Sequence, residues 1–171
     1  MNRKETTAFL SKLLEQTKLC GLGKYWAKEV SIDYGSVDVK RIDYLQFEPP
    51  NQCSVSAIEK GIFIVYEVKS CKADFKSGFG TNFIGEKNYF VMTMETYKEV
   101  INEIPHKVGV LVPIPKGTNM ADEFLEPTPI DGNVSEWKFA TIMPAYPQGR
   151  KRAITELLFC MLRSGKKGIG Q

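Results

Sequence analysis

Residues 61–70, GIFIVYEVKS, form the stretch of sequence that decides the fold. A near-continuous apolar run of this kind is typical of a central β-strand buried on both faces. The run ends with two charged residues, Glu67 and Lys69. Alternate residues of a strand project from the same face about 6.6 Å apart. The two charged side chains are therefore expected to point into one site, with Val68 packing behind them.

Patterns on both sides of this strand predict a mixed sheet. Alternating stretches around the turn Tyr34-Gly35-Ser36 indicate a β-hairpin before it. The expected elements are a helix over 5–19, the two hairpin strands, the strand 61–70, a short helix and loop before residue 87, a strand over 87–94, a helix over 95–105, a strand over 108–115, a loop over 116–134, an edge strand over 135–144 and a helix over 150–163. Antiparallel neighbours followed by βαβ crossovers predict an α/β fold, a mixed sheet with helices on both sides.

Length and composition fit one globular domain. The chain has 171 residues, of which 43% are hydrophobic and 25% charged, values typical of a globular protein with a sizeable core. We expect a single domain over 1–171, with a core at about 5–115 and a C-terminal extension, 116–171, that closes with a basic amphipathic helix. No apolar run approaches the ~20 residues of a membrane span, and the charged start does not resemble a signal peptide. A cytoplasmic location is therefore expected.

The cysteine and histidine content limits the chemistry. The four cysteines, at positions 20, 53, 71 and 160, form no CxxC pair, and His106 is the single histidine. A structural zinc site needs four well-spaced ligands, so we do not expect one here. A single histidine also excludes most metal sites and catalytic triads that depend on histidine. An enzyme built on this chain would use carboxylates and lysines.

An aspartate on the preceding strand gives the Glu67 strand its chemical interest. Asp43 alternates with Leu45 and Phe47 in KRIDYLQF, residues 40–47. If this strand pairs antiparallel with the next, Asp43 lies beside Glu67. Two adjacent carboxylates repel each other unless a divalent cation keeps both ionised, and Mg²⁺ suits such ligands. An ion pair of Asp43 with Arg41 or Lys69 is the alternative.

The Glu-x-Lys spacing alone is not informative. About 1.5 such triplets are expected by chance in a chain of this composition, and two occur, Glu67-Val68-Lys69 and Glu136-Trp137-Lys138. Only the first follows a buried apolar run and is preceded by a strand that carries an aspartate. The context, rather than the triplet, therefore distinguishes the first site.

In this context the chain resembles the PD-(D/E)XK nuclease superfamily, which has a restriction-endonuclease-like fold with an α-β-β-β-α-β core. The resemblance is closest to small bacterial and phage nuclease-like or DNA-repair-type proteins. It covers most of the chain and is carried by WAKEV at 26–30, KRIDYLQFEP at 40–49, IEKGIFIVYEVKSCKADFKSG at 58–78, NFIGEKNYFVM at 82–92, VGVLVP at 108–113 and RAITELLFCMLRSG at 152–165.

The resemblance implies roles for individual residues. Asp43, Glu67 and the carbonyl of Val68 would bind Mg²⁺ or Mn²⁺, and Lys69 would orient or deprotonate the attacking water. Many members add a further carboxylate, for which Glu29 ranks first. Other acidic residues stay open as participants: Asp38, Glu5 and Glu15. The implied activity is metal-dependent hydrolysis of DNA phosphodiester bonds, and the alternative is an inactive member of the fold that binds nucleic acid or a protein partner.

Two basic segments are candidates for contact with DNA. Lys72 and Lys76 are four residues apart and would share one face of the short helix after the Glu67 strand. A second cluster, Arg150, Lys151 and Arg152, is predicted to open the final helix, where cations oppose the helix dipole and favour a bound anion. A solvated tail is the alternative for this cluster.

The resemblance also allows a homodimer, because many such nucleases work as dimers to cut both DNA strands.

Overall fold

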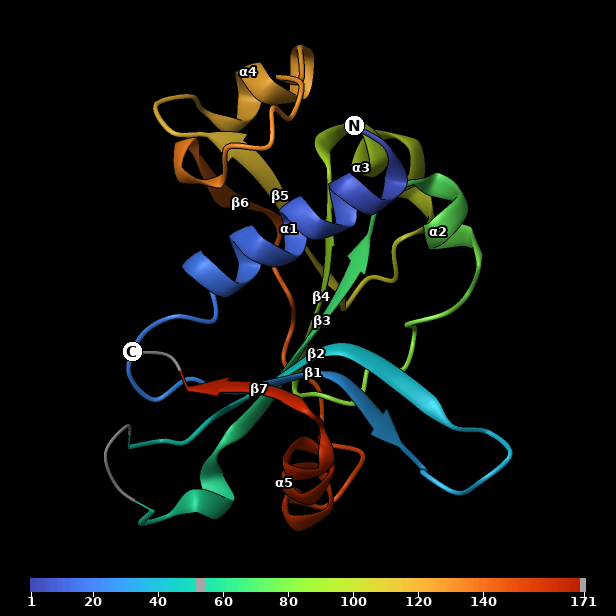
Figure 1. The fold of residues 1–171 in the computed structure, drawn as a ribbon, viewed down its shortest axis with the longest axis vertical. Coiled ribbons are helices and arrows are strands. Elements are labelled where there is room, and N and C mark those ends of the chain that lie inside the picture. The colour runs from blue at the N-terminus through green and yellow to red at the C-terminus, as the bar shows by residue number, and fades with distance from the viewer. Residues whose placement is uncertain (52–54, 170–171) are drawn as a thin grey trace.

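The protein folds around a seven-stranded mixed sheet (Figure 1). This computed structural model describes residues 1–51 and 55–169. The strands are β1 (Tyr25–Ile32), β2 (Lys40–Glu48), β3 (Ile62–Lys69), β4 (Lys87–Met92), β5 (Gly109–Pro115), β6 (Trp137–Met143) and β7 (Lys166–Ile169). The helices are α1 (Arg3–Thr17), α2 (Lys72–Lys76), α3 (Met94–Val100), α4 (Met120–Leu125) and α5 (Ile154–Arg163), with short 3₁₀ turns at Ile58–Lys60, Ile101–Glu103 and Val134–Glu136.

The strand order across the sheet is β6-β5-β4-β3-β2-β1-β7. β1, β2 and β3 form an antiparallel meander. β3, β4 and β5 are parallel, and the crossovers between them contain α2 and α3. β3 therefore occupies the centre, and every residue of it after Ile62 is buried. The predicted mixed sheet flanked by helices, and the central position of residues 61–70, are confirmed.

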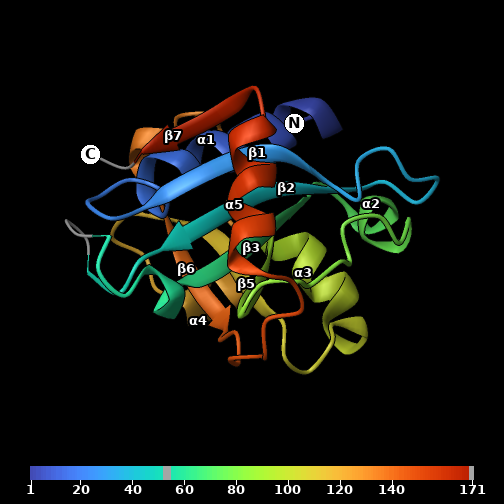
Figure 2. The same ribbon diagram turned by 90° about the horizontal axis from the view of Figure 1, so that it is seen from below.

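Helices cover both faces of the sheet (Figure 2). The apolar side of α1 packs on the face that carries Ile64, Tyr66 and Val68 of β3. α5 packs on the opposite face, against Phe63 and Val65, and α3 joins a third cluster around β4 and β5. Since side chains alternate along a strand, Glu67 and Lys69 belong to the face of Phe63 and Val65. The two charged residues thus follow two core residues on one side of the sheet.

The C-terminal third differs from the sequence-based expectations. α5 begins at Ile154, so Arg150–Arg152 precede the helix instead of opening it. The Arg150 guanidinium donates to the carbonyl of Gly61, and Arg152 pairs with Asp33; these contacts hold the segment against the sheet in a non-helical path. The expected loop over 116–134 contains α4. β6 is an edge strand as predicted, and β7, which the sequence did not predict, forms the other edge.

The start of α1, the state of the cysteines and the length of the helices can also be compared with the expectations from the sequence. α1 begins earlier than predicted because Asn2 and Glu5 form a reciprocal capping box. Cys20, Cys71 and Cys160 are free thiols, while Cys53 lies outside the described residues. In the part of the chain that the structure describes, no helix is both long and apolar enough to cross a bilayer.

Candidate active site

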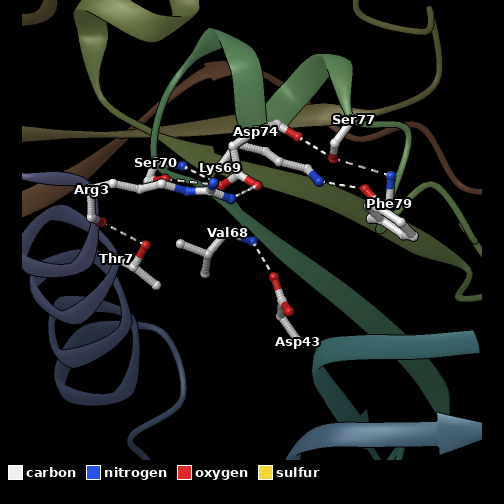
Figure 3. Close-up of polar contacts among 9 residues, drawn as sticks. All are labelled: Arg3, Thr7, Asp43, Val68, Lys69, Ser70, Asp74, Ser77 and Phe79. Carbon is white, nitrogen blue, oxygen red and sulfur yellow. Dashed lines mark hydrogen bonds and ion pairs between the residues drawn. The ribbon is translucent and has the colours of Figure 1, made fainter.

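The candidate site lies where β2 and β3 separate. Their pairing runs from Glu48↔Ile62 to Tyr44↔Tyr66, and the next positions along the two strands are Asp43 and Glu67. Beyond this point the Asp43 carboxylate takes over as hydrogen-bond partner of β3: Oδ2 accepts from the Val68 amide at 2.9 Å (Figure 3). The structure therefore brings Asp43 next to Glu67, as the antiparallel pairing predicted.

Glu67 is a buried acid with an unsatisfied oxygen. Its side chain is 1% exposed, and Oε1 has no hydrogen-bond partner. Burial raises the pKa of Glu67 to about 8, the negative charge of Asp43 adds to the rise, and the Lys69 ammonium opposes it. Burial also raises the pKa of Asp43, against the lowering effects of the Val68 amide, Lys69 and Arg41. Without a bound cation, the ionised form of each of these two carboxyl groups is therefore disfavoured.

Lys69 provides the positive charge of the site. Its side chain is 3% exposed, and Nζ donates a hydrogen bond to the carbonyl of Phe79 (Figure 3). The ammonium lies 6.0 Å from the centroid of the Phe90 ring, an additional favourable contact for a cation. Lys69 is therefore fixed on the same side of the sheet as Glu67, under the loop that follows α2.

Gly80 closes this loop onto the two charged side chains. It has a φ of +71°, and a Cβ at this position would overlap Glu67 Oε2, approach Glu67 Cδ to 2.9 Å and Lys69 Nζ to 3.2 Å. A residue with a side chain would have to displace the carboxylate. The sequence did not predict the role of Gly80, because a glycine in a polar loop is typical of any turn.

Asp74, for which the sequence predicted no role in the site, holds the end of β3 in place. Asp74 of α2 accepts at Oδ2 from the amide and the hydroxyl of Ser70, both at 3.0 Å, and at Oδ1 from Arg3 Nη2 at 2.8 Å (Figure 3). The Asp74 carboxylate thereby joins α1, α2 and the end of β3 beside the site. The sequence offered one indication of it, an acidic residue in the first turn of a helix directly after Lys69.

The other acidic candidates lie elsewhere. Glu29 is exposed on β1 with a φ of +54°, between the pairs Lys28↔Tyr44 and Val30↔Ile42 and hence across from Asp43. Glu15 forms an ion pair with Lys28 on the α1 side of the sheet, Glu5 caps α1, and Asp38 is exposed in the hairpin turn before β2. Within residues 1–51 and 55–169, no three Asp, Glu, His or Cys side chains converge closely enough to hold a metal ion.

The basic residues that are candidates for contact with DNA differ in their ion pairs and in their exposure. Lys76 pairs with Glu103 at 3.1 Å, Arg150 with Glu86 at 3.2 Å, and Arg152 with Asp33 and Glu156. Lys72 is partly exposed on α2 and Lys151 is exposed before α5. Arg150 also contacts Gly61, which precedes β3 and lies at the opposite end of that strand from Lys69. Lys72 therefore follows the Lys69 end of β3 by three residues, whereas Arg150 contacts the residue before the opposite end of that strand.

Comparisons with known proteins bear on the fold only. No protein-family model matches the chain, and no curated protein matches it. A solved structure, a protein of unknown function from Silicibacter pomeroyi, is similar with a TM-score of 0.54 and 16% sequence identity over 95% of this chain and 84% of that chain. At this identity the similarity concerns the arrangement of the elements and says nothing about activity.

Proposed function

We propose that the protein is a divalent-metal-dependent nuclease with a restriction-endonuclease-like fold that hydrolyses DNA. One observation carries the proposal: the buried Glu67 carboxylate has an oxygen without a hydrogen-bond partner, next to a second carboxylate and a fixed lysine. Buried polar groups are normally hydrogen-bonded, and each exception needs an explanation. A ligand that binds carboxylates is such an explanation.

The residues present fit a small divalent cation. Mg²⁺ takes one or two carboxylates together with waters and phosphate oxygens, and Asp43 and Glu67 supply two carboxylates. The Val68 amide faces Asp43, and since the N–H and C=O of one strand residue point toward the same neighbour, the Val68 carbonyl is expected to face the same gap. Asp43, Glu67 and Val68 would therefore hold Mg²⁺ or Mn²⁺, which when bound would supply charge stabilisation and a more acidic water.

The protein residues divide the remaining tasks. The Lys69 side chain would stabilise negative charge that develops on a phosphate during hydrolysis. The Phe79 carbonyl fixes the ammonium in this position, so little reorganisation is needed when a substrate binds. The hydrogen bond from the Val68 amide keeps Asp43 in the gap between β2 and β3.

DNA is the proposed substrate on the strength of the superfamily resemblance, and the net charge of +3 is compatible with it. Lys72, which is partly exposed three residues after Lys69, would meet a backbone phosphate, and Lys151 is a second candidate. A homodimer and a role in phage or DNA-repair biology belong to the same proposal.

The test is a cleavage assay on single-stranded, double-stranded and branched DNA with Mg²⁺ or Mn²⁺. We expect Lys69→Ala to abolish cutting. The matched control is Lys138→Ala, because Lys138 belongs to the other Glu-x-Lys triplet and is exposed. Cutting that persists in both Lys69→Ala and Asp43→Ala would refute the assignment, since the acidic pair and the lysine would then be unnecessary.

A second candidate function is that of an inactive member of the fold that binds DNA or a protein, which agrees with the absence, among residues 1–51 and 55–169, of three acidic, His or Cys side chains grouped to hold a metal ion. In that case the hydrogen bond from Lys69 to the Phe79 carbonyl would serve only to satisfy a buried ammonium. Calorimetry separates the two candidates: heat of Mn²⁺ binding that disappears in Asp43→Asn supports the nuclease, and the absence of binding to the wild-type protein supports the inactive member.

A further inference from the structure

Phe79 stands out among the exposed apolar residues because of its position. Its side chain is 81% exposed, although single exposed apolar residues are common in proteins and need no explanation by themselves. Its own carbonyl accepts the hydrogen bond from Lys69, and the adjacent Gly80 packs on Glu67. Consecutive Cα atoms are about 3.8 Å apart, so the backbone of Phe79 lies at the candidate site, and its ring is drawn next to the carbonyl that Lys69 contacts (Figure 3).

The loop presents the ring on a fixed support. Ser77 Oγ donates to the Asp74 carbonyl at 2.7 Å, and Thr81 Oγ1 donates to the Gly78 carbonyl at 3.0 Å. At the far end, Asn82 Nδ2 donates to the Arg41 carbonyl of β2 at 3.3 Å. The loop thus spans from α2 to β2 across the acidic pair, held at both sides.

The ring contributes little to the folded core. Phe75 and Phe83, which flank Phe79 in the sequence, pack against Phe90 at ring-centroid distances of 5.2 and 5.5 Å. Phe79 is exposed instead. At 81% exposure, most of the Phe79 surface is in contact with solvent rather than with protein. A flat group can therefore approach Phe79 without displacing protein atoms.

We propose that Phe79 contacts the substrate by stacking on an unpaired base of single-stranded DNA, next to the phosphate at Glu67 and Lys69; this rests on the proposed nuclease function. Every base has a π-face that stacks on an aromatic ring, whereas a paired base in a duplex has its faces covered by its neighbours. A phenyl ring has no hydrogen-bonding group, so it reads no base identity. The substrate class is thus single-stranded DNA, or an unpaired end, without sequence preference.

Fluorescence tests the contact directly. The exposed position allows Phe79→Trp, and the F79W indole is expected to be quenched when an oligothymidine binds in EDTA, where no cutting occurs. Wild-type protein gives the background from Trp26 and Trp137. The matched control is Phe159→Trp, because Phe159 is another exposed phenylalanine, on α5; the F159W indole is expected to stay unquenched.

Affinity provides the second readout. By anisotropy, Phe79→Ala is expected to bind oligothymidine about tenfold more weakly, within the range of one lost base stack, and Phe79→Tyr is expected to bind like the wild type. An F79W indole that stays unquenched at saturating oligothymidine, an unchanged affinity in Phe79→Ala, or no oligothymidine binding by the wild type overturns the inference. Equal quenching by a blunt duplex overturns the preference for single strands.

The outcomes distinguish this inference from the proposed function. Lys69-dependent cutting without quenching means that the nuclease proposal stands and Phe79 is not a contact. Quenching and weakened binding without any cutting mean that Phe79 contacts DNA in a protein that does not hydrolyse it.

Discussion

Replacing Glu67 by glutamine should make the metal-free protein more stable at neutral and alkaline pH. In the folded protein Glu67 stays protonated up to its raised pKa of about 8, whereas in the unfolded chain it ionises near 4.5. Stability that is present below pH 4.5 is therefore lost as pH rises toward 8, because the unfolded state releases the proton first. Glutamine does not titrate, so the variant avoids this loss.

The size of the effect follows from the two pKa values. One pKa unit corresponds to 1.36 kcal/mol, so a rise from 4.5 to about 8 corresponds to about 5 kcal/mol. The free energy of unfolding of Glu67→Gln minus that of the wild type should be near zero at pH 4.5. It should rise by about 1.4 kcal/mol per pH unit and level off above pH 8 at about 5 kcal/mol.

Urea unfolding in EDTA at intervals from pH 4.5 to 9 measures this difference. Glu136→Gln is the matched control, since Glu136 stands in the other Glu-x-Lys triplet and is exposed; the gain of Glu67→Gln with rising pH should exceed that of the control. A constant difference for Glu67→Gln across the range would refute the reasoning, because it would mean that Glu67 has an ordinary pKa in the folded protein.

Three further predictions concern the same site. Gly80→Ala should destabilise the protein by about 1–3 kcal/mol in urea unfolding, and by clearly more than Gly78→Ala, which shares a positive φ but meets no neighbouring atoms; equal losses would show that Gly80 does not pack on Glu67. Mn²⁺ should raise the Tm of the wild type more at pH 8 than at pH 5, because protons compete for the carboxylates, and a Tm shift independent of pH would contradict binding at this pair. Asp43→Asn keeps an acceptor for the Val68 amide, so it should fold normally in calorimetry yet lose the Mn²⁺-induced Tm shift; a shift of wild-type size would place the metal elsewhere.

The sequence predicted those parts of the site that depend on local pattern and one strand pairing. The apolar run before Glu67 required a central strand, and the alternation around Asp43 required a partly buried strand beside it, so the acidic pair followed from antiparallel register alone. Val68 as the residue between Glu67 and Lys69 needed only the period of a strand.

The parts that were missed depend on contacts across the chain. Phe79 and Gly80 reach Glu67 and Lys69 through the path of a loop, which glycine content does not determine. Arg150 precedes α5 because Glu86 and the Gly61 carbonyl hold its guanidinium, and these partners are far away in the sequence. The amphipathic pattern predicted a helix at the right place but could not fix its first residue.

Stability alone does not account for the acidic pair, as the other buried polar side chains show. Gln46, which is fully buried, donates to Glu48 and accepts from Tyr66. Asn88, also fully buried, uses both ends of its amide on the backbone of Gly85. Each of these groups has partners on both of its polar atoms, as expected where burial serves the fold.

Glu67 departs from this rule in the same sheet. Its Oε1 is the one buried side-chain oxygen or nitrogen without a hydrogen-bond partner in residues 1–51 and 55–169, and an apolar residue of similar volume would avoid the penalty of burying it. The Glu67 carboxyl is within electrostatic reach of both Asp43 and Lys69, and a cation at the unpaired oxygen would remove the penalty that the fold leaves in place. A ligand would explain a buried carboxylate under these conditions, and in the proposed nuclease that ligand is a divalent cation.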